Sequence, residues 1–169
     1  MELLIPGLIL VALMVWASTK IKKTAADAFE PEFIETETYS LQKPEGFLHV
    51  IGAEEHEFMA YAKDFGKGDS TGIRQATIEI DFISGENVRA VRDSIRRAAI
   101  NSELRAESGA TCELLAEETA NESSTSAFYK IVGAGDDVYR LRFGVLPEHK
   151  DEYLRRIDET LESFTIKTN

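Results

Sequence analysis

An apolar run at the N-terminus constrains the organisation of this chain more than any other feature. From Leu3 to Thr19 there are 17 consecutive residues without a charge. As a helix, this stretch would be about 26 Å long, near the lower limit for crossing the hydrocarbon core of a bilayer. It has no polar face at any helical register, which disfavours a buried helix of a globular core. We therefore predict a single transmembrane anchor formed by Leu3, Leu4, Ile5, Leu8, Ile9, Leu10, Val11, Leu13, Met14, Val15 and Trp16.

The charges that flank the run predict its orientation. Lys20, Lys22 and Lys23 follow it, whereas Met1 and Glu2 supply no basic side chain before it. Cationic flanks stay on the cytoplasmic side of a membrane. The asymmetry therefore predicts a bacterial-type inner membrane protein with its N-terminus outside and residues 20–169 in the cytoplasm.

The alternative is an exported protein whose apolar run is a cleaved signal. A secretory signal normally begins with a positively charged region, and this chain begins with Met-Glu. The tripeptides at 15–17 and 26–28 nevertheless satisfy the small-residue rule for cleavage, so export after cleavage stays open.

The rest of the chain predicts one α+β domain. We divide the sequence into an anchor with a basic flank at 1–23, an acidic linker at 24–37 and a soluble domain at 38–169. Alternation or apolar clustering indicates strands at 33–40, 47–51, 57–65, 73–83 and 110–120, and a hairpin at 127–146. Helical spacing indicates amphipathic helices within 85–100 and after Pro147. The expected fold is a mostly antiparallel sheet of about six strands flanked by two amphipathic helices.

Particular residues carry these expectations. Ser84 is a candidate cap for the first helix. The core candidates of the 73–83 strand are Ile73, Ile78, Ile80 and Phe82. Those of the terminal helix are Tyr153, Leu154, Ile157, Leu161 and Phe164.

Charge and cysteine content exclude some classes of partner and bond. The net charge is −11, from 19 basic and 30 acidic residues. Without the three lysines of the flank and Glu2, residues 24–169 carry 16 positive and 29 negative charges, a net −13. Such a field repels nucleic-acid backbones, so no nucleic acid is expected as a partner. Cys112 is the sole cysteine, so no internal disulfide can form.

Two segments resemble a known family. "YSLQKPEGF" (Tyr39–Phe47) is similar to the opening strand and turn of PsbP-like domains, and the helix running into "LESFTIK" is similar to their closing helix. The resemblance implies an antiparallel sheet with flanking helices and the role of a scaffold or accessory subunit. That family includes extrinsic subunits of a photosynthetic complex. The predicted membrane helix is a departure, because the extrinsic members lack one.

The motifs that could carry chemistry each favour a structural interpretation. His49, His56 and His149 are widely spaced, and the acidic "EEHE" at 54–57 is more typical of a solvated turn than of a metal site. The glycines of "GKGDSTG" at 66–72 lack the order of a phosphate-binding loop and are expected to join two strands. Anionic Glu113 lies beside Cys112, which argues against a reactive thiolate. We therefore predict no catalytic residue, cofactor or metal.

One basic cluster stands out in this acidic domain. Arg89, Arg92, Arg96 and Arg97 fall within nine residues of the first predicted helix, against a single Asp93. They either pair with surface carboxylates or bind lipid phosphates or an acidic partner.

These features predict a single-pass, membrane-anchored, non-enzymatic interaction domain. Its expected role is an accessory or assembly subunit of a larger membrane protein complex, for example an energy-transducing one. Its partners would be the lipid bilayer and other membrane subunits. The alternative is a membrane-tethered sensor or carrier that binds a small ligand between its sheet and helices.

Overall fold

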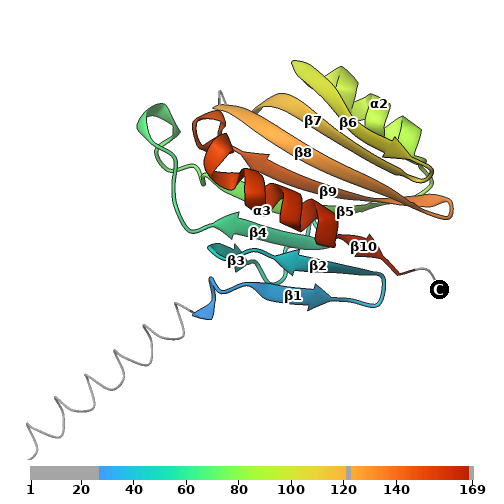
Figure 1. Ribbon diagram of the computed structural model, residues 1–169, viewed down its shortest axis with the longest axis horizontal. Helices are drawn as coiled ribbons and strands as arrows, with labels where there is room; N and C mark the ends of the chain where they lie inside the picture. The colour runs from blue at the N-terminus through green and yellow to red at the C-terminus, as the bar shows by residue number, and fades with distance from the viewer. Residues whose placement is uncertain (1–26, 121–122, 168–169) are drawn as a thin grey trace, which may run out of the picture.

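Two antiparallel sheets form the framework of the domain (Figure 1). The computed structural model describes residues 27–120 and 123–167. The three-stranded sheet has the order β1 (Glu32–Glu35), β2 (Tyr39–Lys43) and β10 (Thr165–Ile166). The seven-stranded sheet has the order β3 (Phe47–His49), β4 (Phe58–Ala62), β5 (Ala76–Ile83), β9 (Asp137–Val145), β8 (Ser123–Ala134), β7 (Thr111–Ala120) and β6 (Asn101–Ser108). The predicted α+β class with a mostly antiparallel sheet and two helices is confirmed.

The helices lie on opposite faces of the larger sheet. Helix α3 (Lys150–Ser163) and the three-stranded sheet cover one face, where the main core lies between β5, β9, β2 and α3. Helix α2 (Val88–Ala98) covers β7 and β8 on the other face. A second, smaller core lies beneath it, formed by Val91, Ile95, Cys112, Leu114, Ala116, Ala127, Tyr129, Ile131 and Val138.

Local capping and turn chemistry explain where these elements begin and end. The Asn87 side chain accepts a hydrogen bond from the Ala90 amide at 2.9 Å and so caps α2. Ser84, the expected cap, instead donates a hydrogen bond to the Asp137 carboxylate. Gly135 has a positive φ of 68° in the β8–β9 hairpin, a conformation that favours glycine. Pro147 begins the short 3-10 helix η2 (Pro147–His149) that leads into α3.

Fewer residues of the predicted 73–83 strand are buried than the sequence suggested. Ile78 and Ile80 are fully buried, as predicted. Ile73 precedes the strand and is 39% exposed, and Phe82 near its end is 42% exposed, so both core assignments were wrong. Leu154 is also 39% exposed, because it lies outside the α3 stripe that faces the sheet.

Ten strands are described where about six were expected. Nearly every residue of β6 is exposed, so this edge strand lacks the apolar alternation by which strands are recognised. Strand β10 has only two residues and exists through its pairing with β2. β10 therefore depends on a neighbour that is distant in sequence, whereas β6 pairs with β7 across a two-residue turn.

The chain between 24 and 37 is partly folded onto the domain. β1 occupies Glu32–Glu35 within this segment and pairs with β2. The predicted anchor and its three lysines lie outside the described residues. Within residues 27–120 and 123–167, no helix combines the length and apolar character that crossing a membrane requires.

A buried lysine fastens the first described residues to the sheet. The Lys43 side chain is 1% exposed, and its ammonium donates hydrogen bonds to the carbonyls of Glu30 at 2.6 Å and Phe47 at 2.7 Å. A longer hydrogen bond of 3.4 Å reaches the carbonyl of Ala28. Burial lowers the pKa of Lys43, and the Glu32 carboxylate at 4.0 Å opposes that shift. This ammonium group joins the N-terminal segment to β2 and β3.

We expect Lys43→Met to lower the free energy of unfolding by about 1–3 kcal/mol, because buried carbonyls lose their donor. The Gly46 amide, which donates to the Phe29 carbonyl at 2.7 Å, should exchange its hydrogen faster. Urea denaturation and hydrogen exchange of the full chain measure both effects. Lys67→Met, at an exposed position, is the control. Equal stability of the two variants would contradict the role of Lys43.

Candidate functional site

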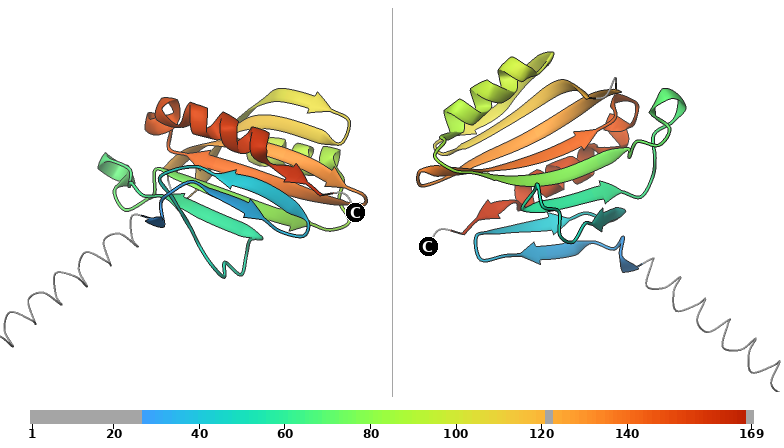
Figure 2. Two further views of the ribbon diagram at one scale, coloured as in Figure 1. Left: turned by 60° about the horizontal axis from the view of Figure 1, so that its bottom comes forward. Right: turned by 180° about the vertical axis from the view of Figure 1, so that it is seen from behind.

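The second face of the seven-stranded sheet is only partly covered. Figure 2 (right) shows α2 over one corner of this face, and no described helix crosses β5. Ile78 and Ile80 point into the main core, so the alternate residues Thr77, Glu79 and Asp81 lie on the opposite face. This face carries most of the polar interactions between strands.

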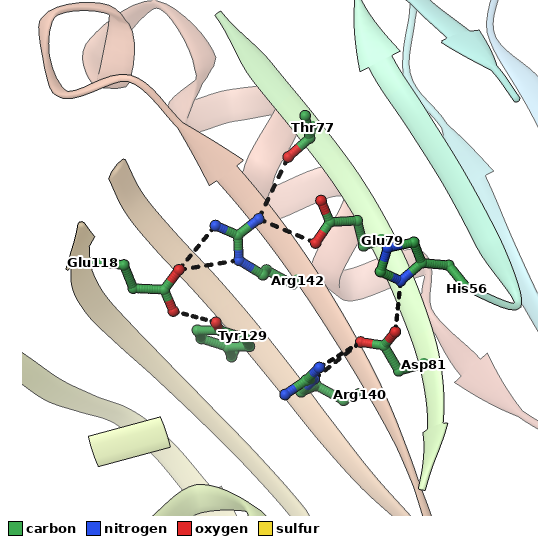
Figure 3. A network of polar contacts seen from close by, with 8 residues as sticks. All are labelled: His56, Thr77, Glu79, Asp81, Glu118, Tyr129, Arg140 and Arg142. Carbon is green, nitrogen blue, oxygen red and sulfur yellow. Dashed lines mark hydrogen bonds and ion pairs between the residues drawn. The ribbon is translucent and has the colours of Figure 1, made fainter. Parts of the chain in front are cut away.

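Arg142 is the centre of an ionic network on this face (Figure 3). Its guanidinium donates to Glu79 at 3.1 Å and to Glu118 at 2.9 and 3.2 Å. The Tyr129 hydroxyl donates to the other oxygen of Glu118. Thr77 lies 3.5 Å from the same guanidinium. The network therefore links β5, β9, β8 and β7 across the sheet.

The surroundings of Arg142 keep it charged and in place. Burial by itself lowers the pKa of Arg142, but Glu79, Tyr129 and Glu118 together raise it above the usual arginine value. A Cβ atom at Gly144 would lie 2.8 Å from the guanidinium, so the absence of a side chain there provides its space. The Tyr129 pKa is raised, mainly by burial. The raised pKa values keep the Arg142 guanidinium and the Tyr129 hydroxyl protonated, which suits both groups to a structural role rather than to proton transfer.

A second ionic cluster lies next to the first. Arg140 donates to Asp81 at 2.7 and 3.1 Å, and the His56 ring lies 2.7 Å from the other oxygen of Asp81. The side chain of Asp81 is 14% exposed. Asp81 thus joins β9 to the loop before β4, which includes the acidic 54–57 segment.

The four arginines of α2 differ in their surroundings. Arg92 is 14% exposed and pairs with Glu107 at 2.6 Å and with Asp93 at 2.9 Å, so it links the helix to β6. Arg89, Arg96 and Arg97 are exposed and form no ion pair with another described residue. The structural interpretation therefore fits Arg92. The other three cations have no carboxylate partner among residues 27–120 and 123–167, and Arg97 donates only to the Asp93 carbonyl of its own helix, at 3.2 Å.

A groove of about 640 Å³ separates α2 from the end of β5 and from β9. Arg97 approaches it from the helix and Arg140 from the sheet. Its other lining residues are Ile83, Glu86, Ala90, Val91, Asp93 and Ser94. A volume of this size is typical of sites that take a small molecule or a few side chains of a partner.

Arg140 and Arg142 were not recognised in the sequence. The available signal was the alternation of β9, in which Tyr139, Leu141 and Phe143 leave both arginines on the other face. Their acidic partners on β5 depend on the register Glu79↔Arg142 and Asp81↔Arg140. No local pattern contains that register.

The described residues offer no catalytic constellation. Burial raises the pKa of the Cys112 thiol, and Glu107 adds to this effect, so its reactive thiolate form is disfavoured. No three metal-binding side chains converge among residues 27–120 and 123–167. The "GKGDSTG" segment joins β4 to β5 through the 3-10 turn η1 (Gly68–Ser70), as predicted.

No family model matches this chain, and no curated protein matches it. Similar folds do occur among solved structures. The cyanobacterial PsbP (CyanoP) from Synechocystis sp. PCC 6803 is 11% identical, with a TM-score of 0.54 over 82% of this chain and 94% of that protein. The Ran-binding protein Mog1p from Saccharomyces cerevisiae is 11% identical, with a TM-score of 0.52 over 83% of this chain and 97% of that protein.

At this identity the likeness concerns the fold alone. It extends over most of the described domain and over nearly the whole length of both neighbours. The resemblance to PsbP-like domains, first indicated by Tyr39–Phe47 and the closing helix, is therefore confirmed for the arrangement of strands and helices.

Proposed function

We propose that this chain is a membrane-anchored, non-enzymatic interaction domain that serves as an accessory or assembly subunit of a larger membrane protein complex. Two observations support the proposal. The sequence at 1–23 has the length, apolar character and basic flank of an anchor. The domain also shares its fold with CyanoP and with Mog1p, a protein named for binding Ran.

The exposed arginines of α2 indicate the kind of partner that the domain would bind. Residues 24–169 have a net charge of −13, so an acidic partner is repelled over most of the domain. Arg89, Arg96 and Arg97 interrupt this field on one helix, and Arg97 shares its groove with Arg140. An acidic segment of a neighbouring subunit is therefore guided to α2. Its carboxylates match the planar guanidinium fork, which binds them through paired hydrogen bonds.

A second candidate function is the binding of a small ligand in the same groove. Its volume of about 640 Å³ falls within the usual range for such sites. Arg97, which unlike Arg140 has no carboxylate partner among the described residues, would then bind the acidic group of a small organic anion. This candidate differs from the first because a small molecule alone would stabilise the domain.

The proposed topology places the domain on the cytoplasmic side. Alkaline phosphatase fused to the C-terminus should therefore be inactive in bacterial cells, because the enzyme requires an oxidising compartment to form its disulfides. Replacing Lys20, Lys22 and Lys23 with glutamine should raise its activity, since the retention signal is then removed. High activity of the unchanged fusion would reverse the topology.

We expect Arg89→Gln/Arg96→Gln/Arg97→Gln to weaken contact with the acidic partner while leaving the fold stable. A photo-crosslinking amino acid at exposed Ser94, beside the groove, should capture a neighbouring membrane protein in native membranes. The triple substitution should reduce that crosslinked product at least fivefold, because glutamine lacks the positive charge that attracts the acidic partner.

Charge-matched substitutions on α3 provide the control for this experiment. Lys150→Gln/Arg155→Gln/Arg156→Gln removes the same charge and should leave the crosslink unchanged. Equal loss in both variants would contradict a specific role for α2. A crosslink that is absent throughout, with thermal stabilisation by small organic anions, would favour the second candidate function.

The paired Arg142 should behave differently from the free arginines. Arg142→Met leaves Glu79 and Glu118 without their counterion and should destabilise the fold by roughly 2–4 kcal/mol, less than for a fully buried pair because the side chain is 17% exposed. The stability of Arg142→Lys should lie between those of the unchanged chain and Arg142→Met, since lysine keeps the positive charge but lacks the planar guanidinium fork. Urea denaturation measures both, with Arg155→Met as the exposed control. A stability loss no larger than that of the control would contradict the structural role.

A further inference from the structure

Several loops meet where the described chain begins. The Phe29 carbonyl accepts a hydrogen bond from the Gly46 amide at 2.7 Å, and the Gly46 carbonyl accepts one from the Lys63 amide at 2.8 Å. The segment between β4 and β5, which contains η1, starts at Lys63. Figures 1 and 2 show the first described residues and η1 at the same end of the sheets. The first described residues therefore lie next to Lys63, where this segment begins.

Aromatic and cationic side chains alternate on this surface. The Lys63 ammonium lies 5.9 Å from the centre of the Phe29 ring, and the Arg74 guanidinium lies 3.9 Å from the centre of the Phe65 ring. Phe65 is 48% exposed and Ile73 is 39% exposed, although both are large and apolar. We name these five residues the N-terminal edge. Its combination of exposed apolar groups and cations is typical of protein surfaces at the membrane interface.

The N-terminal edge is held rigidly. Phe65 and Arg74 form an antiparallel bridge, and Arg74 donates to the Lys63 carbonyl at 2.8 Å. A Cβ atom at Gly66 would lie 2.5 Å from the Leu146 side chain, which shows how closely the loop approaches η2. The exposure of Phe65 and Ile73 is therefore a fixed feature of the fold rather than the result of a loose loop.

We propose that the N-terminal edge rests on the headgroup region of the bilayer that holds the anchor. This inference rests on the proposed anchoring of residues 3–19. Between Lys23 and Asp27 the chain can extend no further than about 14 Å, so the end that contains Asp27 must stay close to the membrane. Phe65 and Ile73 enter the interface, and Lys63 and Arg74 lie at the level of the lipid phosphates.

The charges around the N-terminal edge define the kind of lipid contact. Its two cations are outnumbered by acids on the same segments, namely Asp27, Glu30, Asp64 and Asp69, and by Glu45 beside Gly46, which hydrogen-bonds to Phe29 and Lys63. Attraction to anionic lipid is therefore not the driving force, and the contact depends on burying aromatic and aliphatic surface. A zwitterionic phosphatidylcholine bilayer is sufficient for it.

Depth-dependent quenching in the full chain tests this contact. Phe65→Cys, Ile73→Cys and Asp136→Cys are each labelled with the fluorophore NBD, while the buried Cys112 stays unlabelled in the folded chain. Asp136 is a control far from the N-terminal edge. It lies in the β8–β9 hairpin, where β9 begins, whereas Val145 at the other end of β9 pairs with Ala76, which follows the η1 segment. Each chain is reconstituted in phosphatidylcholine nanodiscs with or without nitroxide-labelled headgroups.

Nitroxide lipid should reduce the fluorescence at positions 65 and 73 at least twofold and leave position 136 unchanged. Trp16, the sole tryptophan, reports separately on the anchor. Quenching of Trp16 without quenching at 65 and 73 would overturn this inference and leave the anchor intact. An unquenched Trp16 would overturn the proposed anchor and this inference with it. Quenching at 65 and 73 that requires anionic lipid would overturn the proposed apolar contact.

Discussion

The register between β5 and β9 determines both the core and the polar face of this domain. Ile78 opposes Phe143 and Ile80 opposes Leu141 on one side, while Glu79 opposes Arg142 on the other. A shift of one residue would move arginines toward the core and isoleucines toward solvent. Paired charges contribute little net stability when their desolvation is counted. Here they make the wrong register costly, because a slipped arginine would lose its carboxylate.

The polar face also separates two kinds of arginine. Arg142 and Arg92 each bind two carboxylates and connect elements of the fold. The exposed arginines of α2 form no ion pair among the described residues, and the one hydrogen bond of Arg97, to the Asp93 carbonyl, stays within the helix, so they retain their capacity to bind. The sequence showed only that four arginines share one helix. Their division into structural and free groups depends on Glu107 and Asp93, and Glu107 belongs to a strand that the sequence did not reveal.

Elements with their own periodicity or turn chemistry were predictable. The β8–β9 hairpin, α3 and the buried Ile78 and Ile80 all follow from local patterns. The misses have two physical causes. β6 pairs with β7 across a two-residue turn, but its exposed residues lack the apolar alternation that marks a strand, and Ile73 is exposed because it precedes the buried residues of β5. Where a distant segment sets the environment, as β2 does for β10, no local pattern carries the signal. The groove was missed for the same reason, because its two walls come from α2 and β9, which are far apart in the sequence.

The hydrogen bonds of Lys43 would allow the proposed anchor to orient the domain and not only to tether it. A tether transmits no orientation if it is flexible, and it then only raises the local concentration of the domain. Here the chain is held from Ala28 onward by a buried ammonium, and β1 extends the attachment along β2. With the N-terminal edge on the lipid as proposed, the domain would lose most of its rotational freedom before any partner arrives. Docking of an acidic segment at α2 would then cost less entropy, since the orientation is already fixed by the membrane.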